Sequence, residues 1–534
     1  MKPKLNLPRL LALASTCFAF FVVTASAEDA VVEKWGRFEI LLNGPAEGNP
    51  FMEVELEATF TNGFETKTVS GFYDGDGVYR IRFMPEATGE WRYRTQSSAW
   101  ELSNQVGEFE VVAPSSDNHG PVSVYNTYHF AYADETPYWV MGTTSYTWTH
   151  RPAEFEELTL KTLEESPFNK LRMCVFPQTH GTKMDQSQPM PPERFPFEGE
   201  GTDPNYERFN PEFFQHLEMR VQNLQDLGIE ADLILFHPYD DDHIWGLDHM
   251  DDATEERYIR YIVARLSSYR NVWWSIANEF DFVRNKTDAD WDRNFQVVVD
   301  ADPYGHLRSI HNGKEIYDNN KPWVTHASIQ NGAAADTVTA AQLYRDVYRK
   351  PVVYDELEYE GNHDLRWAQL TGEDLVHRFW AATAAGTYGG HSEFIFDDED
   401  TSQVVWLGQG GELKGDSPER LAFLLEILEN GPLGGFEPID KWHWDPTVGQ
   451  PGVQYLTYFG RQAPEEWEFK LYKGLEAGMK FKVEIIDAWN MTITPVKGVF
   501  EIGEKKDYHH YDTKGRSIQL DGKPYQALRI TRVN

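Results

Sequence analysis

The sequence predicts an α/β protein in which a (β/α)8 TIM barrel is flanked by two β-sandwich domains. The chain has 534 residues, which is more than one ordinary core organises, so several domains are expected. Its middle alternates short β-branched or aromatic runs with longer helix-like stretches, whereas both ends consist of strand-like runs separated by turn residues. The predicted divisions are a signal peptide over 1-27, an N-terminal β-sandwich over 28-116, the barrel over 117-430 and a C-terminal β-sandwich over 431-534.

The first 27 residues have the three parts of a signal peptide. Basic residues come first, an apolar run over 10–23 follows, and Ala25-Ser26-Ala27 supplies the small residues that a signal peptidase needs. The apolar run is shorter than the roughly 20 residues that a bilayer span requires. We therefore expect a cleaved leader and a secreted or periplasmic protein, with a retained N-terminal anchor as the alternative.

The charge and the cysteines restrict the partners and the chemistry. The formal net charge of −36 becomes −39 when the leader takes away its three basic residues, so neither nucleic acid nor an anionic membrane is expected as a partner. Cys17 leaves with the leader, and Cys174 alone cannot form an intrachain disulfide. Because Cys174 lies in an apolar run over 171–176, we expect a buried, inert thiol.

The N-terminal domain is predicted from alternating apolar and polar residues, as in Phe51–Glu57 and Val78–Phe83. Between two such runs, Asp74-Gly75-Asp76-Gly77 has the composition of a calcium loop, but Asp-Gly is also a strong hairpin signal, and we prefer the hairpin. The segment 113–121 is rich in loop formers and lacks an apolar period, so the domain junction is expected there.

Eight strand-like runs predict the closed barrel. Helix-like stretches such as Phe213–Leu227 and Thr254–Ser268 lie between them, and strand patterns return in 479–486 and 527–531 of the last domain. The eight runs are Tyr138–Gly142, Lys170–Phe176, Ile229–Phe236, Val272–Ala277, His306–His311, Trp323–Ala327, Pro351–Tyr354 and Gly386–Gly390.

Two of these runs end in glutamates. In a barrel of this kind the reacting groups lie at the C-terminal ends of the strands. The fourth run is followed by Asn278-Glu279 and the seventh by Asp355-Glu356, so two carboxylates are expected to converge over the barrel mouth. Cleavage of a glycosidic bond needs such a pair, with a separation of about 5 to 5.5 Å when the configuration is retained. Glu279 and Glu356 are therefore the predicted catalytic residues.

Other strand ends carry groups able to bind sugar hydroxyls or to stack on a sugar ring. A metal alternative arises because His237 is followed by Asp240-Asp241-Asp242-His243, but we read this run as a solvated loop and predict neither metal nor cofactor. The polar candidates are Arg172, His237, His311, Asn312, His326, Gln330, His391 and Glu393, and the aromatic ones are Tyr146, Trp148, Trp245, Trp367 and Trp406.

Several segments together resemble bacterial glycoside hydrolases of clan A, similar to apiosidase-like proteins with an uncharacterised domain at each end. The segments are Gly71–Gly77, Arg82–Pro85, Gly89–Trp91, Gly142–His150, Ala277–Asp281, His306–Asn312 and Thr325–Gln330. The resemblance covers nearly all of the mature chain. It implies a retaining mechanism with Glu279 as general acid/base, Glu356 as nucleophile, and Asn278 bound to the 2-hydroxyl of the sugar.

The expected function is hydrolysis of a plant or algal polysaccharide or oligosaccharide through a covalent glycosyl-enzyme. Glu358 lies on the same face as Glu356 if the strand continues, and Glu393 ends the eighth run, so both are alternatives for the nucleophile. Two other functions stay open: a catalytically inactive carbohydrate-binding or scaffold protein, and a transglycosylase built on the same barrel.

Overall fold

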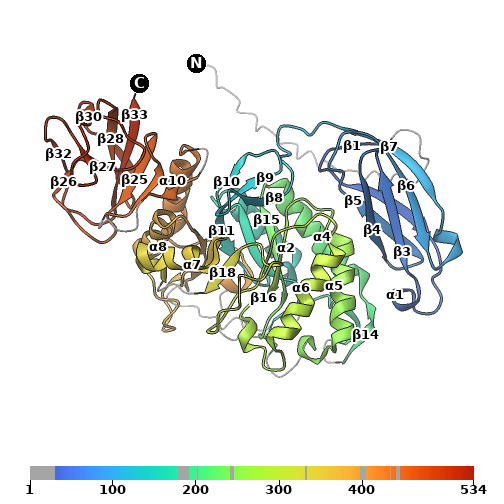
Figure 1. The fold of residues 1–534 in the computed structure, drawn as a ribbon. Helices are drawn as coiled ribbons and strands as arrows, with labels where there is room; N and C mark the ends of the chain where they lie inside the picture. Colours follow the sequence, from blue (N-terminus) through green and yellow to red (C-terminus); the bar gives the residue numbers. More distant parts are fainter. Residues whose placement is uncertain are drawn as a thin grey trace, which may run out of the picture.

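Three bodies follow one another in the fold, with the barrel between the two β domains (Figure 1). The computed structural model describes residues 30–178, 192–200, 203–240, 246–330, 334–396, 405–432, 435–439 and 445–533. The predicted signal peptide lies outside these ranges. Within them, no helix combines the length and the apolar character that crossing a membrane requires.

The N-terminal domain is the predicted β-sandwich. Its two sheets share β4, which pairs with β3 through its first half and with β5 through its second half. The alternation predicted for 51–57 is interrupted, because Pro50 starts the short helix α1 (Pro50–Glu53). The strands are β1 (Val31–Glu33), β2 (Phe38–Asn43), β3 (Leu56–Thr61), β4 (Thr66–Tyr73), β5 (Val78–Phe83), β6 (Gly89–Ser97) and β7 (Val106–Val112), in the order β1-β7-β6-β3-β4-β5-β2.

The Asp-Gly segment after β4 is a hairpin turn, as preferred from the sequence. The backbone N–H of Asp74 donates to the carbonyl of Val78 at 2.8 Å. The carboxylate of Asp74 accepts hydrogen bonds from Arg80 at 2.6 Å and from Arg265 at 2.7 Å. Two guanidinium groups therefore neutralise this side chain.

The barrel contains the eight predicted strands as one parallel ring. They are β11 (Met141–Thr144), β12 (Lys170–Cys174), β15 (Glu230–Phe236), β16 (Val272–Ala277), β17 (Arg308–Ser309), β18 (Ala327–Gln330), β19 (Val352–Glu356) and β21 (Tyr388–His391). Their order is β17-β16-β15-β12-β11-β21-β19-β18. A parallel bridge between His311 and Ser328 joins the two ends of this row and closes the barrel.

The helices around the barrel begin near the predicted positions. Asn210 caps α4, since its side chain accepts from the N–H of Glu212, and Asp251 caps α5 by accepting from Thr254. The helices are α2 (Ala153–Glu164), α4 (Pro211–Asp226), α5 (Asp252–Leu266), α6 (Asp288–Ala301), α7 (Val338–Tyr348), α8 (Gly372–Ala384) and α10 (Ser417–Glu429).

Two strands are displaced from their predicted ranges. Tyr138 belongs to β10 (Pro137–Tyr138), which forms a small sheet with β8 (Val122–Tyr125) and β9 (His129–Tyr132). In this sheet Phe130 packs against Trp273 at the N-terminal end of the barrel, with ring centroids 5.2 Å apart. The sixth strand begins at Ala327 and not at Trp323, since its pairing with β19 starts at Ala327 opposite Val352, and the indole of Trp323 donates to the Tyr317 hydroxyl.

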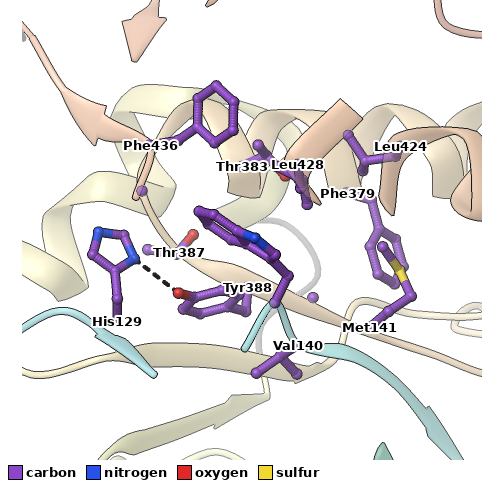
Figure 2. Close-up of a pocket in the computed structure, with 13 residues that line it drawn as sticks. His129, Val140, Met141, Phe379, Thr383, Thr387, Tyr388, Leu424, Leu428 and Phe436 are labelled. Atoms are coloured by element: carbon purple, nitrogen blue, oxygen red, sulfur yellow. Dashed lines mark hydrogen bonds between the residues drawn. The ribbon is translucent and has the colours of Figure 1, made fainter. Parts of the chain in front are cut away.

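A cavity at the N-terminal end of the barrel is separate from the predicted site. Its walls include Met141 at the start of β11 and Tyr388 at the start of β21, and helix α8 contributes Phe379. Figure 2 shows the His129 ring beside Tyr388 and the hydrogen bond between them; the ring Nδ1 lies 2.8 Å from the hydroxyl oxygen. Because both strands enter the barrel here, this cavity lies opposite the mouth at which Glu279 and Glu356 were expected.

The C-terminal domain is a β-sandwich attached to helix α8. The Trp380 ring of α8 packs against Tyr458, with centroids 5.3 Å apart, and His377 Nδ1 lies 2.9 Å from the Tyr458 hydroxyl. The main sheet contains β23 (Glu437–Pro438), β24 (Thr447–Gln450), β25 (Gln454–Tyr458), β33 (Gln526–Val533), β28 (Lys480–Asp487), β29 (Thr492–Pro495) and β30 (Phe500–Glu501). Two further pairs are β26 (Glu466–Glu468) with β32 (Ser517–Gln519), and β27 (Lys470–Leu471) with β31 (His510–Tyr511).

A buried network of ion pairs fastens the N-terminal domain to helices α4 and α5. Arg265 of α5 is fully buried and binds both Asp74 and Glu218. Arg82 of β5 donates to Glu218 and to the backbone carbonyl of Arg265. Although burial opposes ionisation, Arg265 and Arg82 lower the pKa of Glu218 to about 2. The two domains therefore share one set of compensated charges.

We expect Arg265→Ala to destabilise the protein by about 3 to 5 kcal/mol, because it removes one of the two guanidinium partners of each of the buried carboxylates Asp74 and Glu218. The matched control is Arg260→Ala on the same helix, whose partner Glu256 and own side chain are both about half exposed. This control should cost less than about 1 kcal/mol. Thermal and urea unfolding measure the free energy of unfolding of the two variants. Equal losses of stability in Arg265→Ala and Arg260→Ala would contradict the role given to the buried ion pairs.

Candidate active site

The first carboxylate, Glu279, lies in a sharp turn directly after β16. The N–H of Asn278 still donates to the carbonyl of Phe236 on the neighbouring strand, at 2.9 Å. Glu279 then takes the left-handed conformation, with φ of 42°. Such a backbone is uncommon for a residue with a side chain and is concentrated at functional sites. The turn brings Phe280 against β17, where its N–H bonds the carbonyl of His311 at 3.0 Å.

The second carboxylate reaches the site through a bulge in β19. Ser328 lies opposite Val353 and Gln330 lies opposite Glu356, so β19 has one extra residue between these pairs. In a regular strand Asp355 and Glu356 would lie on opposite faces. Here Asp355 binds Lys170 inside the barrel at 2.7 Å, while Glu356 accepts from Tyr146 at 2.6 Å.

One side-chain amide joins the two carboxylates. Gln330 Nε2 lies 2.8 Å from Glu279 Oε1 and 2.6 Å from Glu356 Oε2. These two oxygens are therefore at most roughly 5.4 Å apart, which agrees with the separation of about 5 to 5.5 Å found in retaining glycosidases and is shorter than the roughly 6.5 Å or more of inverting ones.

Glu356 is surrounded by cationic and hydrogen-bonding groups. Besides the Tyr146 hydroxyl, Arg172 Nη1 lies 3.4 Å from Glu356 Oε1 and His311 Nε2 lies 3.3 Å from the same oxygen. Burial raises the pKa of this carboxyl, but His311, Arg172 and Tyr146 together hold the pKa of Glu356 well below its usual range. Glu356 is therefore ionised near neutral pH, as a nucleophile must be.

Among the described residues, no cation contacts Glu279. Its Oε2 accepts from the Tyr239 hydroxyl at 2.6 Å, and its other oxygen accepts from Gln330. Burial and the negative charge of Glu356 raise the pKa of Glu279 to about 7, against the opposing hydrogen bonds from Tyr239 and Gln330. The two carboxyls thus differ in protonation at neutral pH, which is the difference that separates an acid from a nucleophile.

Asn278 ties the surroundings of the two carboxylates together. Its Oδ1 accepts from Arg172, and its Nδ2 donates to the Tyr239 hydroxyl at 2.5 Å and to the Tyr146 hydroxyl at 3.3 Å. These are the same two tyrosines that donate to Glu279 and Glu356. Asn278 is fully buried, so its amide orients the donors of both carboxylates.

A buried ionic group lies below the site. Lys170 binds Asp232 at 2.6 Å and Asp355 at 2.7 Å, and all three side chains are almost completely buried. Asp355 also accepts from the Ser328 hydroxyl at 2.5 Å, and Ser328 Oγ lies 2.8 Å from His311 Nδ1. This chain of contacts fixes the His311 ring so that its Nε2 faces Glu356.

Neither alternative nucleophile joins the pair. Glu358 binds Arg378 at 3.1 Å and also pairs with Arg366. Glu393 accepts from the backbone N–H groups of Lys414 and Gly415, at 2.5 and 2.8 Å, and burial raises the pKa of Glu393 to about 7. The expected contact of Glu393 with substrate is therefore corrected, because its oxygens hold the loop before α10.

The predicted histidines divide into three groups. His311 contacts Glu356 directly, and His237 supports the site indirectly, since its Nδ1 accepts from the N–H of Tyr239 at 3.2 Å. His326 packs against Trp273 at the N-terminal end of the barrel, and His391 stacks on Phe168 with centroids 4.5 Å apart. Burial lowers the pKa of both His326 and His391 to about 3, so these two are neutral core residues and not substrate ligands.

The tryptophans expected to stack on a sugar are mostly core residues. Trp148 and Trp406 are buried almost completely, and their indole N–H groups bond Met173 and Thr143. No ring face is left for a ligand, and we correct both assignments. Trp367 is partly buried against Tyr359.

Trp245 and the residues 241–243 of the metal alternative lie outside the described residues. Across the described ranges, no group of three or more His, Cys, Asp and Glu side chains is placed to hold a metal ion.

Five residues of this network were not predicted from the sequence. Two are tyrosines, one two residues beyond His237 and one among the glutamates of 355–361, and no local pattern sets them apart from core tyrosines. Lys170 and Asp232 carried a signal, since each is a charged residue inside an apolar run. The five are Tyr239, Tyr359, Lys170, Asp232 and Ser328.

The barrel with this pair of buried carboxylates defines the class of glycoside hydrolase TIM barrels. A family model described as the apiosidase-like catalytic domain matches residues 125–465, which is more than half of the chain, and the protein belongs to this family. Two domains of unknown function, DUF5060 and DUF5605, match residues 31–98 and 442–531. No curated protein sequence gives a significant match.

Solved structures give the same architecture. A candidate glycoside hydrolase from Bacteroides vulgatus is 43% identical, with a TM-score of 0.90, and the match covers 94% of this chain and 100% of that one. A family 5 glycoside hydrolase from the same organism is 16% identical over 77% of this chain and 94% of that one, with a TM-score of 0.56, and it shows the fold alone.

Because the pKa of Glu279 is raised in the folded protein, the stability of the protein should depend on pH through this group. The unfolded carboxyl ionises near 4.5 and the folded one near 7, so this group's favourable contribution is present below pH 4.5 and is lost as the pH rises through about 7. Glu279→Gln removes the titration. We expect the stability of the variant relative to wild type to increase by about 3 kcal/mol between pH 4.5 and pH 8.

Unfolding in urea at several pH values measures this difference. The control is Glu90→Gln on β6 of the N-terminal domain, the same substitution at a side chain that is 55% exposed, and the change found for Glu279→Gln is compared with it. A pH-independent difference for Glu279→Gln would contradict the assignment of a raised pKa.

Proposed function

We propose that the protein is a secreted, retaining glycoside hydrolase that cleaves a plant or algal polysaccharide or its oligosaccharides. The observation that carries this proposal is the pair of carboxylates within hydrogen-bond distance of one amide nitrogen, one held ionised and the other with its pKa near neutral. Family membership supports the class of reaction. The acidic charge and the N-terminal leader support an extracellular or periplasmic location.

In the first step Glu356 attacks the anomeric carbon while Glu279 gives its proton to the departing glycosidic oxygen. The products are the leaving alcohol and a glycosyl ester of Glu356. In the second step Glu279 takes a proton from water, the water oxygen bonds to the anomeric carbon, and Glu356 leaves as a carboxylate. Arg172, Tyr146 and His311 stabilise the carboxylate form of Glu356 before attack and after release.

We expect Glu279→Ala and Glu356→Ala each to lower turnover of a responsive glycan by about a hundredfold or more. Azide restores bond cleavage by replacing the missing carboxylate: Glu356→Ala should give a glycosyl azide of inverted configuration, and Glu279→Ala one of retained configuration. Sugar release and product configuration are measured by chromatography and NMR. Retained activity in Glu356→Ala would exclude this residue as the nucleophile.

The matched controls are Glu358→Ala and Glu393→Ala, because neither side chain contacts the carboxylate pair. Both should keep turnover within about tenfold of wild type when they fold. Addition of sugar acceptors distinguishes a transglycosylase, which would transfer the glycosyl group to the acceptor in preference to water. A folded wild type without turnover on plant and algal glycans, but with affinity for one of them, would favour the binding protein.

A further inference from the structure

Gln330 has an unusually constrained position between the two carboxylates. It is the last residue of β18 and lies opposite Glu356 beyond the bulge. The side chain of Asn312, which follows β17, contacts both polar groups of the Gln330 backbone. Asn312 Oδ1 accepts from the Gln330 N–H at 3.1 Å, and Asn312 Nδ2 lies 3.5 Å from the Gln330 carbonyl oxygen. The start of the side chain is therefore fixed by two neighbouring strands.

Both hydrogens of the Gln330 amide are used by the carboxylates. A primary amide nitrogen has two N–H groups, and Gln330 Nε2 donates to Glu279 Oε1 and to Glu356 Oε2. Its carbonyl oxygen accepts no hydrogen bond from any residue within the described ranges. Since the amide is planar, this free acceptor lies beside the carboxylate pair, and the half-buried side chain is accessible to a ligand.

We propose that Gln330 is a positioning residue that sets the separation of Glu279 and Glu356 and offers its carbonyl oxygen to a hydroxyl of the sugar bound between them. This inference rests on the proposed glycosidase function and assigns a role to one further residue of that site. The carboxylates are otherwise held from different strands, and among the described contacts the Gln330 amide alone donates to both.

The hydrogen bond from Gln330 also distinguishes the two forms of Glu279. Glu279 Oε2 accepts from Tyr239 and Oε1 accepts from Gln330, so both oxygens receive hydrogens while the carboxyl is ionised. An N–H group donates more strongly to an ionised carboxylate than to a neutral carboxyl. The bond is therefore weaker in the acid form of Glu279 and stronger when the proton has left. Gln330 therefore favours the base form.

Other groups face the pair from every neighbouring strand end and stay in place when Gln330 is changed. Some donate to Glu356, and Tyr239 donates to Glu279. Because these groups are the same in wild type and in the Gln330 variant, a change in the Glu279 titration reports the contribution of Gln330. These groups are Tyr146 after β11, Arg172 of β12, Tyr239 after β15, Asp281 after β16, His311 after β17 and Tyr359 after β19.

The test replaces Gln330 with Met, which has a similar length and neither the donor nor the carbonyl acceptor. In Gln330→Met we expect the titration of Glu279 to move upward by about one pH unit, because the donor to its ionised form is lost. Carbon-13 NMR of protein labelled at the glutamate carboxyl carbon follows this titration, and Glu279→Gln identifies the resonance. The KM for a responsive glycan should rise about fivefold.

Gln222→Met on α4 is the control, since Gln222 bonds Asp226 and Arg37 away from the mouth and undergoes the same chemical change. Gln222→Met should change neither the titration of Glu279 nor the KM. An unchanged Glu279 titration in folded Gln330→Met would overturn the inference, and so would an unchanged KM. The NMR titration needs no turnover, so an inactive wild type would refute the proposed function while the positioning role is still decided.

Discussion

The site depends on keeping two carboxylates, with facing oxygens at most roughly 5.4 Å apart, in a largely buried barrel mouth. Like charges at that separation repel strongly when water is excluded. The structure resolves the conflict by giving the two groups unequal surroundings. Glu356 is contacted by Arg172, His311 and the Tyr146 hydroxyl, whereas the described donors to Glu279, Tyr239 and Gln330, are neutral. The charge of Glu356 is compensated by its partners, and the charge of Glu279 is reduced because its pKa of about 7 keeps part of the carboxyl protonated at neutral pH.

The rigidity of this arrangement comes from the strands below it. Lys170 holds Asp232 and Asp355 across the barrel interior, and the Ser328 hydroxyl connects Asp355 to His311. Each functional side chain is therefore supported by a second buried contact. Since a glycosidase gains its rate from donors arranged in advance, such support is a direct contribution to the proposed reaction.

The flanking domains act on the sides of the barrel. The N-terminal sandwich is joined to α4 and α5 through Arg82, Glu218 and Arg265, and the C-terminal sandwich packs on α8 through Tyr458. Within the described ranges neither sandwich contributes a side chain to the carboxylate pair. Their observed contacts brace the helices that surround the strands, and the conspicuous Asp-Gly hairpin belongs to one of these braces.

The sequence by itself determined the architecture and the two carboxylates. Strand and helix periods depend on local residue order, and a glutamate one residue beyond an apolar run identifies a barrel strand end without any knowledge of distant contacts. Arg172, His311 and Gln330 were predicted as polar groups at strand ends, Asn278 from the family resemblance, and Tyr146 as a ring that stacks on sugar. The structure brings all five to the pair, with Tyr146 as a hydrogen-bond donor to Glu356.

Tertiary structure alone decided which polar and aromatic strand-end residues face the mouth. The bulge in β19 changes the side on which Asp355 and Glu356 lie, and such a shift depends on the pairing with β18. Trp148, Trp406, His326 and His391 look like binding residues in the sequence but are covered by packing. Burial, register and the partner of each hydrogen bond arise between segments far apart in the chain, and no local pattern contains them.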